Sequence, residues 1–166
     1  MDARDRLIVA LDVDSLAEAE RLLDRLAGPV TRFKIGSQLF TAAGPPAVEL
    51  VQKRGAEVFL DLKFHDIPNT VAGAVSSAGR LGVSLVDVHA LGGKEVLEAA
   101  VGALPAMGIR LLAITVLTSH DDETLKGLGL AGPVPDAVRR LAVMAKEAGA
   151  DGVVASPHEV ALVREA

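Results

Sequence analysis

Short apolar runs alternate with segments of helical periodicity along the whole chain of 166 residues, and this alternation limits the fold more than any other feature. The apolar runs are continuous, without regular alternation of polar and apolar side chains, which is typical of strands buried on both faces of a parallel sheet. Repeated strand–helix units of about 30 residues predict an α/β fold with right-handed connections. Both a (β/α)8 barrel and a doubly wound sheet have this order of elements.

The expected elements follow from the apolar runs and from the residues that begin helices. Ser15-x-x-Glu18 and Ser156-Pro157-x-Glu159 match the capping-box pattern. The predicted strands are Leu7–Asp12, Phe33–Gly36, Val58–Lys63, Leu85–His89, Leu111–Leu117 and Gly152–Ala155. The predicted helices are Leu16–Ala27, Pro46–Arg54, Thr70–Leu81, Lys94–Met107 and Pro135–Ala148, and a sixth begins at Pro157.

Polar residues gather where the predicted strands end, which favours the barrel. They are Asp12, Lys34, Asp61, Lys63, His89 and Thr118. In a (β/α)8 barrel the active site lies at the C-terminal ends of the strands, whereas a doubly wound sheet usually has a Gly-rich turn after its first strand. Here the first strand ends in Asp12-Val13-Asp14-Ser15, without glycine. We therefore predict one domain over residues 1–166 with the architecture of a TIM (β/α)8-type barrel.

The number of strand–helix units indicates how much of a barrel the chain can form. Six units can be counted, whereas a closed barrel has eight units in about 250 residues. We therefore expect an incomplete barrel that lacks the two C-terminal units. Residues 119–134 form the one long connection, of a length that often acts as a lid. The run Asp121-Asp122-Glu123 within it is expected to be a solvated face of that loop.

The composition excludes several classes of function. The chain has 17 Lys and Arg against 22 Asp and Glu, a net charge of −5, which argues against nucleic acid or an anionic membrane as partner. It has no cysteine, so disulfides and thiolate metal sites are excluded. Neither a signal peptide nor an apolar run of the ~20 residues that span a membrane is visible. We expect a cytoplasmic protein.

The densest polar cluster is the run DLKFHDIPNT, residues Asp61–Thr70, at the end of the third predicted strand. Period-two alternation predicts that Asp61 and Lys63 project to the same side of that strand. Such a pair buried in a barrel costs several kcal/mol per ion, whereas at the surface it is a weak salt bridge. Both interpretations are open for these two residues alone. Lys34 and Asp12 at the neighbouring strand ends favour a catalytic charge array.

The run Asp61–Thr70 resembles the signature of the orotidine 5′-monophosphate decarboxylase family. Five further segments resemble the same family in the same order, so that the resemblance covers essentially the whole chain. They are LDV at Leu11–Val13, FKIG at Phe33–Gly36, DVHALGG at Asp87–Gly93, VLTS at Val116–Ser119 and GVVAS at Gly152–Ser156. The resemblance implies a lyase that decarboxylates orotidine 5′-phosphate to uridine 5′-phosphate (UMP) in pyrimidine biosynthesis, with no metal and no cofactor.

The resemblance also implies a role for each matching side chain. Lys63 is the expected proton donor to C6 of the pyrimidine, and Asp61 lies beside the substrate carboxylate. Asp12 and Lys34 bind ribose hydroxyls and complete a Lys-Asp-Lys-Asp charge network. Thr118 contacts the base.

A homodimer with shared active sites is a further implication of the resemblance. Asp66, with Ile67 and Thr70, is expected to reach the active site of the neighbouring subunit. The family holds the substrate phosphate with side chains of the seventh and eighth βα units. We expect none of those side chains within residues 1–166.

Two histidines near these motifs are expected to have structural roles. His65 lies inside the signature and is interpreted as a packing or supporting residue. His89 ends the fourth predicted strand and is interpreted as a core histidine with satisfied hydrogen bonds. The four histidines of the chain are scattered and suggest no metal site.

Two alternative functions remain open at this point. Magnesium-dependent sugar-phosphate decarboxylases and aldolases of the same suprafamily share the pattern of Asp61, Lys63 and Asp66. Lys34 argues against them, because a fixed cation opposes binding of Mg²⁺. The non-enzymatic alternative is a truncated scaffold that folds or dimerises without turnover.

Overall fold

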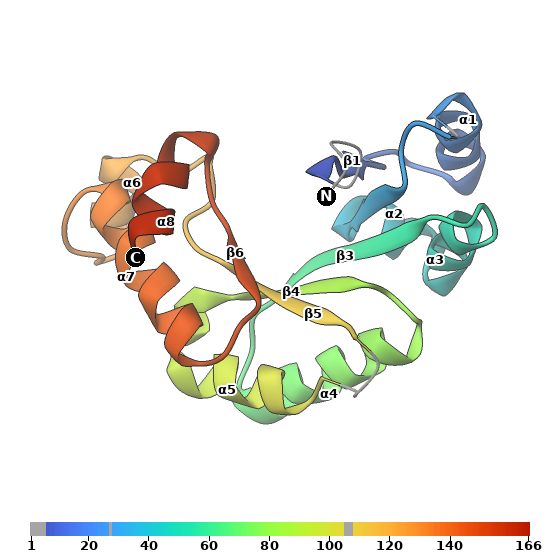
Figure 1. The fold of residues 1–166 in the computed structure, drawn as a ribbon. Helices are drawn as coiled ribbons and strands as arrows, with labels where there is room; N and C mark the ends of the chain where they lie inside the picture. The colour runs from blue at the N-terminus through green and yellow to red at the C-terminus, as the bar shows by residue number, and fades with distance from the viewer. Residues whose placement is uncertain (1–5, 27, 105–107) are drawn as a thin grey trace. The chain divides into compact units, whose positions relative to one another are not determined.

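The computed structural model describes residues 6–26, 28–104 and 108–166. Its six strands form one sheet in the order β1-β2-β3-β4-β5-β6, so strands that are neighbours in the sheet are also neighbours in the chain (Figure 1). The pairs β1–β2, β2–β3 and β5–β6 are parallel. Helices lie between successive strands in the sequence. The predicted α/β class is confirmed.

The bounds of the elements are as follows. The strands are β1 (Val9–Ala10), β2 (Arg32–Gly36), β3 (Glu57–Phe64), β4 (Leu85–His89), β5 (Arg110–Ile114) and β6 (Gly152–Val154). The α-helices are α1 (Leu16–Leu26), α2 (Ser37–Ala43), α3 (Pro45–Gln52), α4 (Pro68–Arg80), α5 (Lys94–Gly102), α6 (Asp122–Gly127), α7 (Val134–Glu147) and α8 (Val160–Glu165). Two 3-10 helices are η2 (Ala90–Gly92) and η3 (Pro157–Glu159). None of these described helices has both the length and the hydropathy of a membrane-spanning segment.

All six predicted strands are present, but several predicted ends are wrong. β1 is confined to Val9–Ala10 instead of Leu7–Asp12, and β5 ends at Ile114 instead of Leu117. The predicted ends are wrong because an apolar run shows which residues are buried, not which residues pair with a neighbouring strand. Val116, for example, is buried against α6 and α7 although it lies beyond β5.

Two short helices are not predicted by the sequence pattern. α2 has seven residues and α6 has six, too few for helical periodicity to be recognised. α6 lies within the segment 119–134, which is predicted to be a loop. Asp121 is its N-cap and accepts a hydrogen bond from the Thr124 N–H at 2.8 Å. Asp121, Asp122 and Glu123 are exposed, as predicted, but they form the N-cap and first turn of α6 rather than a loop face.

The predicted helix ends are mostly within two residues of the observed ones. The largest difference is α5, which ends at Gly102, and residues 105–107 of its predicted range lie outside the described residues. Ala27, the predicted end of α1, also lies outside them. The capping box at Ser156 and Glu159 is confirmed. At Ser15 the box is altered, because the Glu18 carboxylate accepts from the N–H of Asp14 rather than from that of Ser15.

The contacts divide the described residues into two compact units. Unit 1 consists of the described residues within 1–62, 77–86 and 105–109, and unit 2 of those within 63–76, 87–104 and 110–166. Each unit has its own buried apolar side chains. The single domain over 1–166 stays a prediction.

Unit 1 packs α1 and α3 against the first strands. Its fully buried side chains include Leu23 of α1, Ile35 of β2 and Val51 of α3. At the surface, the Arg54 guanidinium lies 2.9 Å from carboxylate oxygens of Glu20 and Asp24. This bridge ties the end of α3 to α1.

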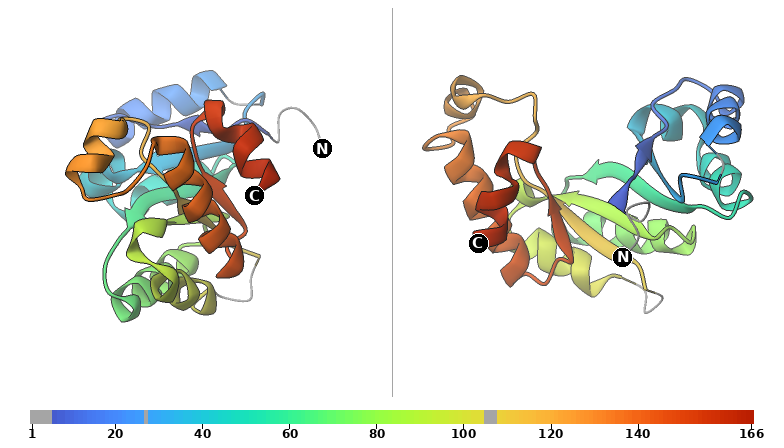
Figure 2. Two further views of the ribbon diagram at one scale, coloured as in Figure 1. Left: turned by 90° about the vertical axis from the view of Figure 1, so that its left-hand side faces the viewer. Right: turned by 45° about the horizontal axis from the view of Figure 1, so that its top comes forward.

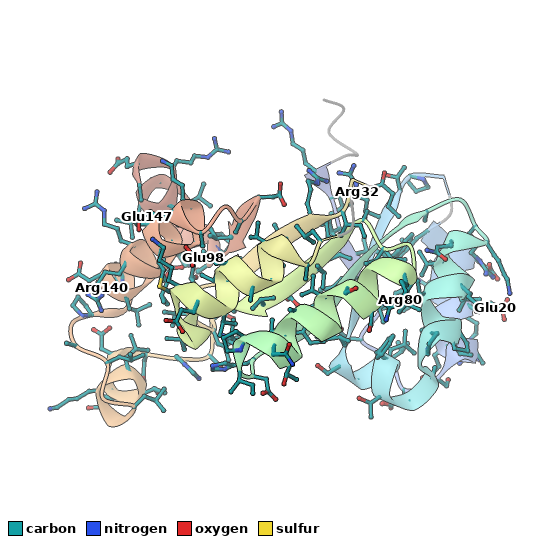
Figure 3. All side chains as sticks on the ribbon, turned by 90° about the horizontal axis from the view of Figure 1, so that it is seen from below. Glu20, Arg32, Arg80, Glu98, Arg140 and Glu147 are labelled. Atoms are coloured by element: carbon teal, nitrogen blue, oxygen red, sulfur yellow. The ribbon has the colours of Figure 1, made fainter. Side chains whose placement is uncertain are left out.

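Unit 2 packs α7 and α8 beside β6, as both views of Figure 2 show. Four buried side chains form an apolar cluster around α6 and α7. They are Val116, Leu125, Ala137 and Val138. On the outer surface the Lys94 ammonium of α5 lies 4.0 Å from Glu98 and 3.9 Å from Glu147 of α7, two residues that are labelled in Figure 3.

Candidate active site

A lysine ammonium held by two carboxylates is the centre of the candidate site on unit 1. Lys34 Nζ lies 2.9 Å from Asp61 Oδ2 and 3.2 Å from Asp12 Oδ1. The parallel register places Lys34 of β2 beside Phe59 of β3, two residues before Asp61. The Asp61 side chain is only 8% exposed, against 23% for Lys34 and 58% for Asp12. Three of the six side chains predicted to gather at the strand ends are therefore in contact.

The electrostatics of this cluster keep Lys34 charged. Burial alone lowers the pKa of Lys34, because a shielded site disfavours the charged form. Hydrogen bonds and charges from Asp61, and then from Asp12, outweigh burial and raise the pKa above its ordinary value of 10.5. Lys34 is thus a fixed cation rather than a group that exchanges protons near neutral pH.

Gly36 leaves space beside this ammonium. A Cβ built at Gly36 would lie 3.1 Å from Lys34 Nζ and 3.4 Å from Asp12 Oδ1. The backbone at Gly36 is extended, with φ −90° and ψ −179°, a conformation open to any residue. Glycine is therefore explained here by the crowded charges and not by backbone strain.

Lys63 has an unusual backbone on unit 2. Its φ is 51°, in the left-handed region, and it is the one non-glycine residue with positive φ within the described residues. This conformation costs an L-residue about 1–2 kcal/mol. The Lys63 N–H donates to Asp87 Oδ1 at 2.8 Å, and Asp87 of β4 is fully buried. A hydrogen bond contributes about 0.5–1.5 kcal/mol, comparable to the conformational cost.

The left-handed residue changes one prediction made from the strand pattern. Period-two alternation requires an extended backbone at each residue, and Lys63 departs from it. The alternation rule therefore gives no direction for the Lys63 side chain relative to Asp61. Their common direction, and the place of Lys63 beside the Lys34 cluster, stay predictions.

The second half of the signature forms an exposed turn on unit 2. Asp66 Oδ1 accepts from the Ile67 N–H at 2.6 Å, and α4 begins at Pro68. Asp66 and Thr70 are exposed, and Ile67 is 66% exposed. A shallow hollow beside them includes Asp66, Ile67 and Leu91 in its lining. These predicted contributors to a neighbouring site are thus accessible on the surface of this unit.

The remaining predicted residues also lie on unit 2. The His65 and His89 rings lie 5.3 Å apart between centroids and are tilted by 35°. His65 is exposed, so its packing role stays a prediction, whereas His89 is half-buried and is not a core residue. Thr118 is exposed just beyond β5. Within the described part of the chain, no group of three or more His, Asp and Glu side chains is placed to hold a metal ion.

Two residues around the predicted positions have no role assigned by the sequence pattern. Gly36 lies in the FKIG segment and Asp87 in the DVHALGG segment. A signal for Asp87 exists, since it is a carboxylate inside the apolar strand Leu85–His89, and an isolated buried charge needs partners. For Gly36 the single sequence contains no comparable signal, because its neighbour in space is the end of a long side chain.

Comparison with known proteins identifies the family of this chain. The profile described as "Orotidine 5'-phosphate decarboxylase / HUMPS family" matches residues 5–166. The chain belongs to this family. An orotidine 5′-phosphate decarboxylase of Pelobacter propionicus is 53% identical over 99% of the chain and 70% of the relative. One from Halorhodospira halophila is 56% identical over 96% of the chain and 69% of the relative.

Solved structures agree with this family. A crystal structure of an uncharacterized conserved protein from Geobacillus kaustophilus has a TM-score of 0.90 at 43% identity, covering 95% of this chain and 77% of that one. The orotidine 5′-phosphate decarboxylase from Lactobacillus acidophilus has a TM-score of 0.87 at 39% identity, covering 96% of this chain and 75% of that one. The predicted family, the enzyme class and the TIM-barrel type of fold are confirmed. The cytoplasmic location stays a prediction.

Proposed function

We propose that this protein decarboxylates orotidine 5′-phosphate to UMP, and that the Lys34 cluster is part of its active site. The observation that supports this most is the contact of Lys34 with Asp61 and Asp12 at 2.9 and 3.2 Å. A largely shielded lysine between two carboxylates contributes little to stability and much to a preorganised electric field. The relatives that match nearly the whole chain carry the name of this activity.

The chemistry explains the need for a lysine at the reacting carbon. The bond between C6 and the carboxylate breaks, CO2 leaves, and the electron pair remains on C6, which has no good electron sink. An ammonium at C6 stabilises this negative charge and then donates its proton to the carbon. Lys63 is the proposed donor, and the resulting amine regains a proton from solvent.

The cluster on unit 1 has the complementary role in this proposal. Asp61 lies beside the substrate carboxylate, and their repulsion is relieved when CO2 leaves. Lys34 limits that repulsion in the free enzyme and binds ribose hydroxyls together with Asp12. Thr118 contacts the pyrimidine.

Steady-state turnover of orotidine 5′-phosphate tests the proposal directly. Lys63→Ala should abolish measurable turnover while UMP binding remains, because Lys63 acts mainly on the developing carbanion. Lys34→Ala should weaken UMP binding as well. Lys94→Ala, which changes an exposed lysine paired with Glu98, is the matched control and should leave both quantities unchanged. Absence of turnover in a protein that also carries the seventh and eighth βα units would refute the proposal.

The magnesium-dependent alternative is distinguished by the same assay. One oxygen of Asp61 and one of Asp12 contact the Lys34 ammonium, which places a positive charge between the two carboxylates. Mg²⁺ prefers several oxygen ligands in octahedral geometry, and a fixed cation among them opposes it. Turnover should therefore be unaffected by EDTA, and loss of activity on EDTA with recovery on Mg²⁺ would favour the alternative.

We also propose a homodimer in which Asp66, Ile67 and Thr70 complete the neighbour's site. Support comes from their exposure and from the apolar surface that Ile67 and Leu91 present beside Asp66. A two-fold dimer places the same patch of each subunit at the interface. Mixing Lys63→Ala with Asp66→Ala chains should then restore one intact site per heterodimer, about half the activity of a wild-type dimer. Confirmed heterodimers without any restored activity would place both residues in one subunit's site.

A further inference from the structure

A strained backbone and a buried carboxylate coincide at the residue proposed to donate the proton. Lys63 has φ 51°, and its N–H donates to Oδ1 of Asp87 at 2.8 Å. Asp87 is fully buried in β4, between the buried residues Val86 and Val88. A carboxylate in such a place is unfavourable for stability and needs another explanation.

We infer that Asp87 is a positioning residue, whose carboxylate holds Lys63 in its left-handed conformation and so sets where the lysine ammonium lies. The inference rests on the proposed role of Lys63 as proton donor. Asp87 itself has no contact with substrate in this scheme and acts through the backbone of Lys63.

The geometry explains how a backbone hydrogen bond can direct a side chain. The bond to Asp87 fixes the peptide plane that precedes Lys63, and φ is the rotation between that plane and the Cα substituents. A strand residue normally has φ near about −120°, so release of Lys63 to that value would swing its side chain to another side of the strand. Strained residues persist where the surrounding structure holds them, and they cluster at active sites.

Substitution of Asp87 by Asn or by Val distinguishes the effect of the hydrogen-bond acceptor from the effect of the carboxylate charge. The Asn side chain keeps an oxygen that can accept from the Lys63 N–H but has no charge. Val has a similar size, suits the apolar strand, and has no acceptor. Asp151 supplies the matched control, because its Oδ2 accepts from the Leu111 N–H at 2.8 Å on a different pair of strands.

Two measurements are needed, turnover and exchange of the Lys63 amide hydrogen followed by NMR. Asp87→Val should lower kcat about 10²-fold with little change in KM and should speed exchange of the Lys63 amide. Asp87→Asn should retain most of the wild-type kcat and most of the protection of the Lys63 amide hydrogen from exchange. Asp151→Asn and Asp151→Val should leave kcat within about twofold of wild type, even if Tm falls.

Each outcome decides the inference. Equal losses of kcat in the Asn and Val variants would show that charge, not the backbone bond, matters, and would overturn it. A parallel rise in KM would indicate general disruption and would also overturn it. If Asp87→Val does not fold, rapid exchange of the Lys63 amide in wild type is sufficient to refute the contact. If turnover is absent in a protein that also carries the seventh and eighth βα units, the proposed function fails, whereas amide exchange still decides whether Asp87 holds Lys63.

Discussion

The Lys34 ammonium lies closer to Asp61, at 2.9 Å, than to Asp12, at 3.2 Å, and the nearer carboxylate is also the more buried one. Distance and shielding therefore act in the same direction. An ion pair gains strength as solvent is excluded, and an exposed pair is screened. The two carboxylates that hold Lys34 are thus unequal partners.

This inequality predicts different costs for removing each carboxylate. Asp61→Ala should destabilise the protein by about 3 kcal/mol, the lower end for breaking a buried pair, because Lys34 keeps some exposure. Asp12→Ala should cost at most about 1 kcal/mol. Urea unfolding of both variants measures the difference. Equal costs would mean that Asp61 is better solvated than its exposure indicates.

The raised pKa of Lys34 predicts a change at alkaline pH. A group whose pKa is higher in the folded state stabilises the fold fully below its unfolded pKa of 10.5 and loses that contribution as pH rises through the folded value. The stability difference between wild type and Lys34→Met should therefore be constant from neutral pH to about 10.5 and then shrink. Urea titrations across this range test it, and a difference that grows above pH 10.5 would contradict it.

Gly36→Ala should weaken UMP binding without straining the backbone. The added Cβ lies 3.1 Å from Lys34 Nζ, so the ammonium must shift by a few tenths of an ångström. We expect roughly tenfold weaker binding of UMP by calorimetry, since small displacements in a preorganised site are costly. Gly73→Ala in α4 is the control, because its Cβ meets nothing within 4 Å. Unchanged UMP affinity in Gly36→Ala would place the ligand away from Lys34.

The left-handed backbone at Lys63 predicts an inverted preference between glycine and alanine. Lys63→Gly should be more stable than Lys63→Ala by about 1 kcal/mol, because glycine adopts positive φ without steric cost. At Arg139, an exposed residue inside α7, the order should reverse, with alanine favoured by about 1 kcal/mol. Thermal unfolding of the four variants gives both comparisons. The same order at both positions would contradict a left-handed Lys63.

The N-cap of α6 predicts an effect at acidic pH. The side-chain hydrogen bond from Thr124, and then its backbone N–H, lower the pKa of Asp121 below 3.8. A lowered pKa stabilises the fold above the unfolded value and loses this effect as pH falls through the folded value. Asp121→Ala should therefore lower Tm at pH 7, and its difference from wild type should narrow below pH 3.8. A difference that stays constant to pH 2 would exclude the charge as its cause.

Much of the fold is predictable from the sequence because buried strands and helices have recognisable patterns of apolar residues. The bounds of β4 at Leu85–His89 are predicted correctly, because glycines precede and follow this apolar run in the sequence and mark its ends. α2 and α6 are too short to show a period, and Val116 is apolar because a helix pair covers it. The same limit applies to the site. Residue types predict that Asp12, Lys34 and Asp61 meet, whereas the positive φ of Lys63 depends on Asp87, which is distant in sequence.

The sequential order of the sheet has a consequence for how the chain acquires its structure. Paired residues are close in sequence: Val9 pairs with Phe33, Phe33 with Val58, and Leu112 with Gly152. Each strand can therefore find its partner as soon as the intervening helix has emerged from the ribosome, without waiting for a distant segment. Synthesis proceeds at about 5–20 residues per second, so successive pairs become available a few seconds apart. The N-terminal strand pairs have the longest time to form before the chain is released.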